Sequence, residues 1–133
     1  MPERENRVPG WSSRLLRWWH RRRFLVADRS MVPTFVPGDR LYVDRRAYRG
    51  NAPAPGDVVV VRDPELPSRF LVKRVAPIPT APSGAPASRD SIYLVGDDPT
   101  SSRDSRQFGP VPTRFVLGRV YQCYSPPEHR REL

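Results

Sequence analysis

Short apolar runs separated by turn-forming residues dominate the pattern of this chain. Valine, leucine, isoleucine and aromatic residues gather in the runs, and glycine, proline or aspartate stand between them. Runs bounded in this way are typical of β-strands. The predicted strands are residues 24–26, 41–43, 58–61, 70–75, 92–95 and 115–124. The pattern therefore predicts a mainly β domain of short strands.

Two of these runs also predict burial. Four consecutive valines, Val58 to Val61, predict a strand that is buried on both faces. In the run 70–75, strand alternation places Leu71, Lys73 and Val75 on one face. Lys73 is therefore expected to lie between two aliphatic side chains.

The two ends of the chain differ from the predicted core at residues 24–125. In segment 1–23, apolar residues from Trp11 onward recur at the helical period among arginines. Two interpretations stay open for residues 11–23: an amphipathic helix in an anionic membrane interface, or a terminal helix packed on the domain. The charged tail, 126–133, is expected to be frayed.

Composition narrows the class of protein. The 133 residues suffice for one domain with a modest core, and the 17 prolines argue against a helical bundle. The formal net charge of +9 suggests an acidic partner such as nucleic acid or an anionic membrane, although part of it reflects a bias toward arginine. Cys123 is the only cysteine, which excludes an intramolecular disulfide, and we expect it to be a buried packing residue. No apolar run approaches the roughly 20 residues of a membrane-spanning helix, so none is predicted.

The stretch from residue 28 to residue 40 is the first candidate for chemistry. Pro33 fixes its own φ and restricts the residue before it, so Ser30 is predicted to lie in a rigid loop. A serine in such a loop can act as a nucleophile only if a base takes its proton. The two histidines, His20 and His129, lie outside the block of predicted strands, which argues against a histidine-based triad.

Lys73 is the second candidate, because it is the only lysine in a chain rich in arginine. A guanidinium cannot lose its proton in a protein, whereas an ammonium can when its charge is desolvated. The aliphatic neighbours predicted on its strand face would desolvate it, so its pKa is expected to be lowered toward that of a general base. The alternative is a lysine on a solvated edge with no catalytic role.

Four sequence boxes, in this order, resemble those of the signal peptidase I-type serine proteases, which use a Ser/Lys dyad. They are Ser30-Met31-Val32-Pro33-Thr34 with Gly38-Asp39, Gly56-Asp57-Val58-Val59, Lys73-Arg74-Val75, and Gly96-Asp97-Asp98 followed by Ser102, Asp104-Ser105-Arg106 and Phe108-Gly109. The resemblance spans about residues 26 to 122. It rests on the order of the boxes, because any one of them alone would be weak.

The resemblance implies a fold and a reaction. The fold is a single small domain with a coiled, barrel-like β-sheet and a protease core at residues 24–125. In the reaction, Ser30 attacks a peptide carbonyl, and neutral Lys73 takes the serine proton. The substrate is a precursor protein, and no cofactor or metal is implied.

The remaining site residues implied by the resemblance support this dyad. Ser102 is implied to orient the lysine ammonium, and Asp104 and Arg106 to form a structural ion pair near it. The nucleophile loop around the serine is completed by Met31, Pro33 and Thr34.

Asp28 departs from the pattern of the family. Many relatives have a small or hydroxyl residue two positions before the nucleophile, whose side chain helps the serine N–H to stabilise the oxyanion. An ionised carboxylate facing that oxyanion would be unfavourable. We therefore expect Asp28 to turn away, to pair with a neighbouring arginine or to be protonated, so that the oxyanion hole rests on backbone N–H groups. Asp98 replaces the usual asparagine of the last box.

Within the family, this short chain without a predicted anchor is most similar to the proteases that mature nickel-type superoxide dismutase. That similarity implies a cytoplasmic enzyme that removes an N-terminal propeptide from a soluble precursor. The first alternative is a signal peptidase that cleaves exported preproteins and is held at the membrane surface by residues 11–23. The second is a non-catalytic basic module that binds nucleic acid. Two features argue against this last alternative: the sequence predicts no helix-turn-helix before the domain, and its aromatic residues are not interleaved with cations in a stacking pattern.

Overall fold

Eight strands form one antiparallel sheet in the computed structural model, which describes residues 21–79 and 90–133. The strands are β1 (Arg21–Leu25), β2 (Arg40–Asp44), β3 (Val58–Arg62), β4 (Phe70–Ala76), β5 (Ser91–Val95), β6 (Val111–Pro112), β7 (Val116–Ser125) and β8 (Arg131–Glu132). The helical elements are short: η1 (Pro99–Ser101), α2 (Ser105–Phe108), η2 (Thr113–Phe115) and η3 (Pro127–His129). The predicted mainly β class is confirmed.

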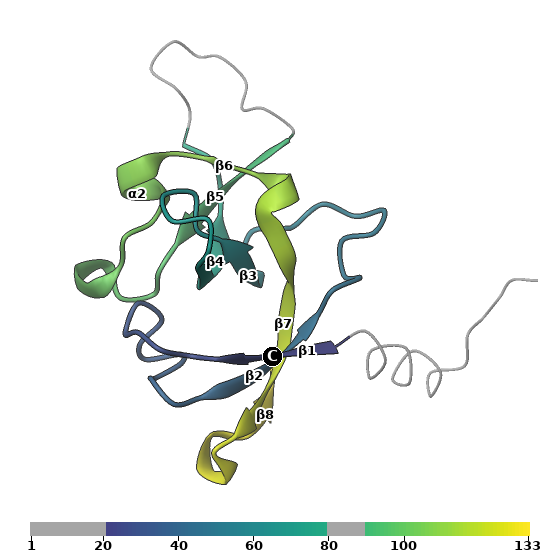
Figure 1. The fold of residues 1–133 in the computed structure, drawn as a ribbon, viewed down its shortest axis with the longest axis vertical. Coiled ribbons are helices and arrows are strands. Elements are labelled where there is room, and N and C mark those ends of the chain that lie inside the picture. Colours follow the sequence, from purple (N-terminus) through teal and green to yellow (C-terminus); the bar gives the residue numbers. More distant parts are fainter. Residues whose placement is uncertain (1–20, 80–89) are drawn as a thin grey trace, which may run out of the picture.

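The sheet curls around its long strand β7, which pairs with strands on both of its sides. The order is β1-β2-β7-β3-β4-β5-β6, and β8 also pairs with β7. In Figure 1, β7 runs from the β1 and β2 end of the molecule to the end that carries β3 to β6. The register between β2 and β7 shifts at two places, which bends the pair. The result is the coiled, barrel-like sheet that the resemblance implied.

The valine strand β3 lies at the centre of the core, as predicted. It pairs with β4 on one side and with β7 on the other. Val58 and Val60 pack in the same apolar cluster as Met31, whereas Val59 and Val61 pack in a second cluster on the opposite face. Strand alternation therefore divides one run of valines between two clusters.

Strand β4 confirms the predicted alternation around Lys73. Leu71 and Val75 belong to the second cluster, and Val72 belongs to the first. Lys73 lies opposite Val59 in the register and is 2% exposed. Its ammonium is therefore taken out of water by its position in the sheet.

The charged tail is not frayed, so that expectation is wrong. Residues of the tail form η3 and β8, and β8 pairs with β7 at Cys123 and Arg131. Nδ1 of His129 lies 2.6 Å from Oδ1 of the buried Asp39, and Arg131 donates to the backbone carbonyl of Thr34. The tail is ordered because it contacts the loop between β1 and β2. The charges of the tail alone do not predict these distant partners.

The N-terminal segment is described only in part. Its last residues, 21–23, belong to β1 and pair with β2, so the expected helix does not extend through them. The proposed membrane-binding residues 11–20 lie outside the described residues. No helix in the part of the chain that the structure describes is both long enough and apolar enough to cross a membrane.

Candidate active site

Ser30 lies in the loop between β1 and β2, and backbone hydrogen bonds join the two ends of this loop. The N–H of Val26 donates to the carbonyl of Asp39 at 2.9 Å, and the N–H of Gly38 donates to the carbonyl of Val26 at 2.8 Å. Inside the loop, Met31 is buried in the first apolar cluster. Ser30 is thus held in a loop whose two ends are hydrogen-bonded to each other and whose Met31 side chain is anchored in the core.

Ser30 is bound through three of its atoms. Its backbone N–H donates to Oδ1 of Asp28 at 3.0 Å, and its hydroxyl donates to the same oxygen at 2.8 Å. Its carbonyl accepts from the N–H of Asp98 at 2.9 Å. Asp28 therefore faces the serine, so the first of the three alternatives, that it turns away, is wrong. The contact forms because a carboxylate two residues earlier can accept from this N–H in a tight turn.

Lys73 reaches toward this loop from β4. Its Nζ donates to Oγ of Ser102 at 2.9 Å. Burial lowers the pKa of Lys73, and the negative charges of Asp28 and Asp104 oppose that shift. In the hydrogen bonds of the described residues, the Ser30 hydroxyl hydrogen points to Asp28 and not to the lysine.

Asp104 connects Ser102 to Arg106. Its Oδ2 accepts from the Ser102 hydroxyl at 2.5 Å, from Nη2 of Arg106 at 2.5 Å and from the N–H of Gly96 at 2.8 Å. The carboxylate also caps the short helix α2, where the N–H of Arg106 donates to Oδ1. Burial would raise the pKa of Asp104, but the hydrogen bonds from Arg106, Gly96 and Ser102 outweigh it and hold that pKa well below its usual range. The residues implied to support the lysine thus form one bonded chain beside it.

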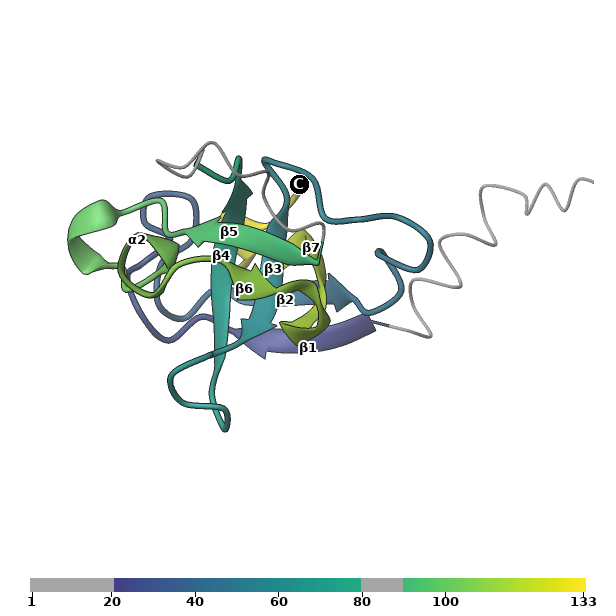
Figure 2. The ribbon, with the colours of Figure 1, turned by 90° about the horizontal axis from the view of Figure 1, so that it is seen from above.

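Gly96 fits where no side chain could. A Cβ at this position would lie 2.5 Å from Cβ of Ser102 and 2.6 Å from the carbonyl oxygen of Ser30. Gly96 is therefore the point at which the nucleophile loop and the Ser102 segment approach each other. In Figures 1 and 2, the loop after β1 and the segment that carries η1 and α2 lie on the same side of the molecule.

We expect Gly96→Ala to lower the free energy of unfolding by about 1–3 kcal/mol, because the added methyl group must displace backbone or Ser102. Denaturant unfolding of this variant beside Ser101→Ala, an exposed position, would measure it. Equal stability of Gly96→Ala and the wild type would contradict the close approach.

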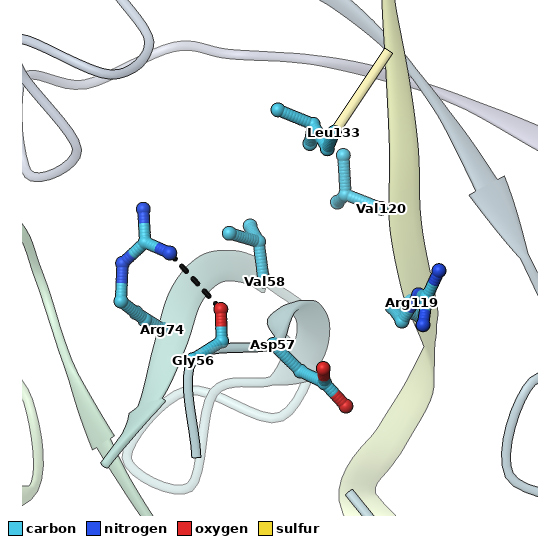
Figure 3. A pocket seen from close by; sticks show the side chains of 7 residues that line it. All are labelled: Gly56, Asp57, Val58, Arg74, Arg119, Val120 and Leu133. Atoms are coloured by element: carbon cyan, nitrogen blue, oxygen red, sulfur yellow. Dashed lines mark hydrogen bonds between the residues drawn. The ribbon is translucent and has the colours of Figure 1, made fainter. Parts of the chain in front are cut away.

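A second bonded chain was not found in the sequence. Thr34 Oγ1 donates to Oδ2 of Asp97 at 2.5 Å, and the same carboxylate accepts from Nε and Nη2 of Arg74 at 2.9 Å. Arg74 also donates to the carbonyl of Gly56, at the side of a cavity of about 310 Å³ (Figure 3). Asp97 was predicted only as part of the last sequence box, and strand alternation, which places Arg74 on the other face of β4 from Lys73, was the only sequence signal for this bridge.

A smaller cavity lies beside the serine loop. It measures about 190 Å³ and is lined by the end of β1, the loop and the start of β4. Most of its lining is apolar, including Val26, Met31, Leu71 and Val72, and Asp28 also lines it. The cavity is mostly apolar and is lined by Asp28 and Met31, which flank Ser30 in the sequence. Among the residues that the structure describes, no group of three metal-binding side chains occurs.

Comparison with known proteins agrees with this arrangement. Residues 14–82 match the family of signal peptidases, peptidase S26. The chain is 36% identical over 105 residues to mitochondrial ATP-independent inner membrane protease subunit 1b of Arabidopsis thaliana, covering 68% of this chain and 62% of that protein. It is 32% identical over 114 residues to subunit 1a from the same plant, covering 75% and 68%. It is also 27% identical over 146 residues to signal peptidase I of Leptolyngbya laminosa, covering 81% and 70%.

The matched region is therefore less than two thirds of the first of these relatives and slightly more than two thirds of the other two. The family match covers residues 14–82, which include the nucleophile loop, β3 and β4. This chain belongs to the signal peptidase family, peptidase S26.

Proposed function

We propose that the chain is a serine endopeptidase that removes a leader or propeptide from a precursor protein, with Ser30 as nucleophile and Lys73 as general base. The observation that carries the proposal is the burial of the only lysine in the sequence. Its Nζ donates to Ser102, and Gly96 closely approaches both Ser102 and the backbone carbonyl of Ser30. Burial lowers the pKa of this lysine and so favours the neutral amine, which is the form that can accept the serine proton. Membership of the family supports the same chemistry.

The proposed reaction has two halves. Oγ of Ser30 attacks the carbonyl carbon of the scissile bond while its proton moves to neutral Nζ of Lys73. The C–N bond then breaks, and the lysine gives that proton to the leaving amine, so that an acyl ester on Ser30 remains. In the second half, water attacks the ester, Nζ takes the water proton and returns it to Oγ, and the acid is released. Ser102 would orient Nζ in both halves.

The substrate would bind as an extended chain between β1 and β4. Strand β5 pairs with β4 only from Arg74 onward, and β1 pairs only with β2 in the described part of the sheet. Among the described strands, the first half of β4 therefore has an unpaired edge next to the cavity of about 190 Å³. An added strand satisfies such an edge through backbone hydrogen bonds, and the cavity selects a side chain. We expect small or apolar side chains there.

Two kinds of precursor fit this proposal, the proform of a nickel-type superoxide dismutase and an exported preprotein. The first rests on the sequence resemblance given above, and the second on relatives that are named as signal peptidases and inner membrane proteases. Incubation with a panel of precursors, followed by mass spectrometry of the new N-termini, would distinguish them. Ser30→Ala is the control, and no Ser30-dependent cleavage of any precursor would refute the proposed peptidase activity.

The pH dependence should report the lysine. Burial lowers the pKa of Lys73 below the ordinary 10.5, and only the neutral amine can take a proton. We therefore expect kcat/KM to rise with pH and to level off as the free enzyme loses this proton, with a midpoint below 10.5. Initial rates at low substrate concentration, measured from about pH 5 to about pH 10, would show this limb. A profile that falls over this range would contradict the role of the lysine as a base.

A further inference from the structure

One oxygen of Asp28 accepts hydrogen bonds from both groups of Ser30 that a peptidase reaction would use. Oδ1 accepts from the backbone N–H at 3.0 Å and from the hydroxyl at 2.8 Å. The N–H of a nucleophilic serine is a common donor to the oxyanion, and the hydroxyl hydrogen must pass to the base. Neither contact helps the reaction as the structure has it.

The distance of this oxygen from the Ser30 nitrogen is that expected for an oxyanion. Donors in an oxyanion hole lie about 2.7–3.1 Å from the oxygen that becomes negative. Asp28 Oδ1 is at such a distance from the Ser30 nitrogen and is itself a carboxylate oxygen. We propose that Asp28 is an internal competitor for the oxyanion position, an autoinhibitory contact that the substrate must displace before Ser30 can react. This inference rests on the proposed peptidase function.

The location of Asp28 allows that displacement. The residue is exposed, as are its neighbours Ala27 and Arg29, so its side chain can rotate without opening the core. It also lines the cavity of about 190 Å³ beside the edge of β4 that is unpaired among the described strands. A peptide bound there would contact the Asp28 side chain directly. Arg69 lines the same cavity, but its guanidinium donates to Asp63 at 2.6 Å and so has a carboxylate partner other than Asp28.

Asp28 also acts on the lysine through its charge. Among the described residues, charged groups act on Lys73 besides its burial: Asp28, Asp104 and Asp63 favour the ammonium, and Arg106 opposes it. Removing the negative charge of Asp28 should lower the pKa of Lys73 further and enlarge the neutral fraction at a given pH. The carboxylate therefore restrains the reaction in two ways, by contact with Ser30 and by its field at Lys73.

Asp28→Asn and Asp28→Ser test this inference, because both remove the charge and keep a polar side chain. We expect kcat/KM on a cleaved peptide to rise about tenfold or more in Asp28→Asn, whose amide can donate to the oxyanion. The acid limb of the pH profile should move to lower pH in both variants. Glu132→Gln is the matched control, because it removes one exposed negative charge in β8 and should leave the rate unchanged.

A peptide aldehyde gives a second measurement. Oγ of Ser30 adds to the carbonyl carbon of the aldehyde to form a hemiacetal, whose oxygen lies in the oxyanion position. The aldehyde should therefore bind about tenfold more tightly to Asp28→Asn than to the wild type. Unchanged or lower kcat/KM, or unchanged aldehyde affinity, in folded Asp28 variants would overturn the autoinhibitory contact. A wild-type enzyme without Ser30-dependent cleavage would instead refute the proposed function, so the two failures are distinguishable.

Discussion

Lys73→Arg is expected to reduce kcat/KM by about 10²–10⁴-fold, a loss approaching that of Ser30→Ala, although the formal charge of the chain does not change. The reason is chemical, because a guanidinium stays protonated in the protein and cannot accept the Ser30 proton. The site also has no space for a larger head group, since Lys73 is 2% exposed and its Nζ already contacts Ser102. Cleavage of a precursor by purified variants, normalised to folded protein, would measure the effect.

Two further variants separate chemistry from packing in this test. Lys73→Met keeps a long apolar stem without a base and should be as inactive as Lys73→Arg while unfolding at a temperature close to that of the wild type. Arg45→Lys makes the reverse exchange at an exposed position and should be fully active. Substantial activity in Lys73→Arg would show that another group takes the serine proton.

Local patterns in the sequence predicted the central strands and the burial of the lysine. Strand alternation has a period of two residues, so Val58 to Val61 and the β4 run determine their own faces without knowledge of distant partners. The chemistry of Lys73 followed from that burial together with the exclusion of histidine. These are the features in which neighbours along the chain decide the environment.

Contacts between distant segments could not be predicted in the same way. His129 and Asp39 are 90 residues apart, and Thr34 and Asp97 are 63 residues apart. Nothing in the local composition of either segment identifies its partner, which is why the tail was expected to be frayed. The alternative in which Asp28 turns away from Ser30 was wrong for a different reason. The expected repulsion from an oxyanion applies during the reaction, whereas in the free protein the carboxylate is attracted to the N–H of Ser30.

Asp104→Asn should have the largest effect on stability. The Asp104 side chain is fully buried and accepts from Arg106, Ser102 and the N–H of Gly96. Removing one partner of a buried ion pair typically costs about 3–5 kcal/mol, because the other charge stays behind. The Arg106 side chain is 34% exposed, so water compensates part of this loss. We expect the free energy of unfolding to fall by about 2–4 kcal/mol at neutral pH.

The pH dependence of this difference identifies its source. The pKa of Asp104 is lower in the folded state than its ordinary value of 3.8, so its contribution to stability is present above about pH 4 and is lost as the pH falls through the folded-state value. The gap between the wild type and Asp104→Asn should therefore narrow only in strong acid. Glu65→Gln is the matched control, because Glu65 pairs with Arg103 at the surface and its loss should change the free energy of unfolding little. A similar small cost for Asp104→Asn would mean that the bonded chain beside Lys73 contributes little to the fold. Because Ser102 donates to Asp104 and accepts from Lys73, a large cost together with lost cleavage would show that the interactions that stabilise this end of the sheet also orient the base.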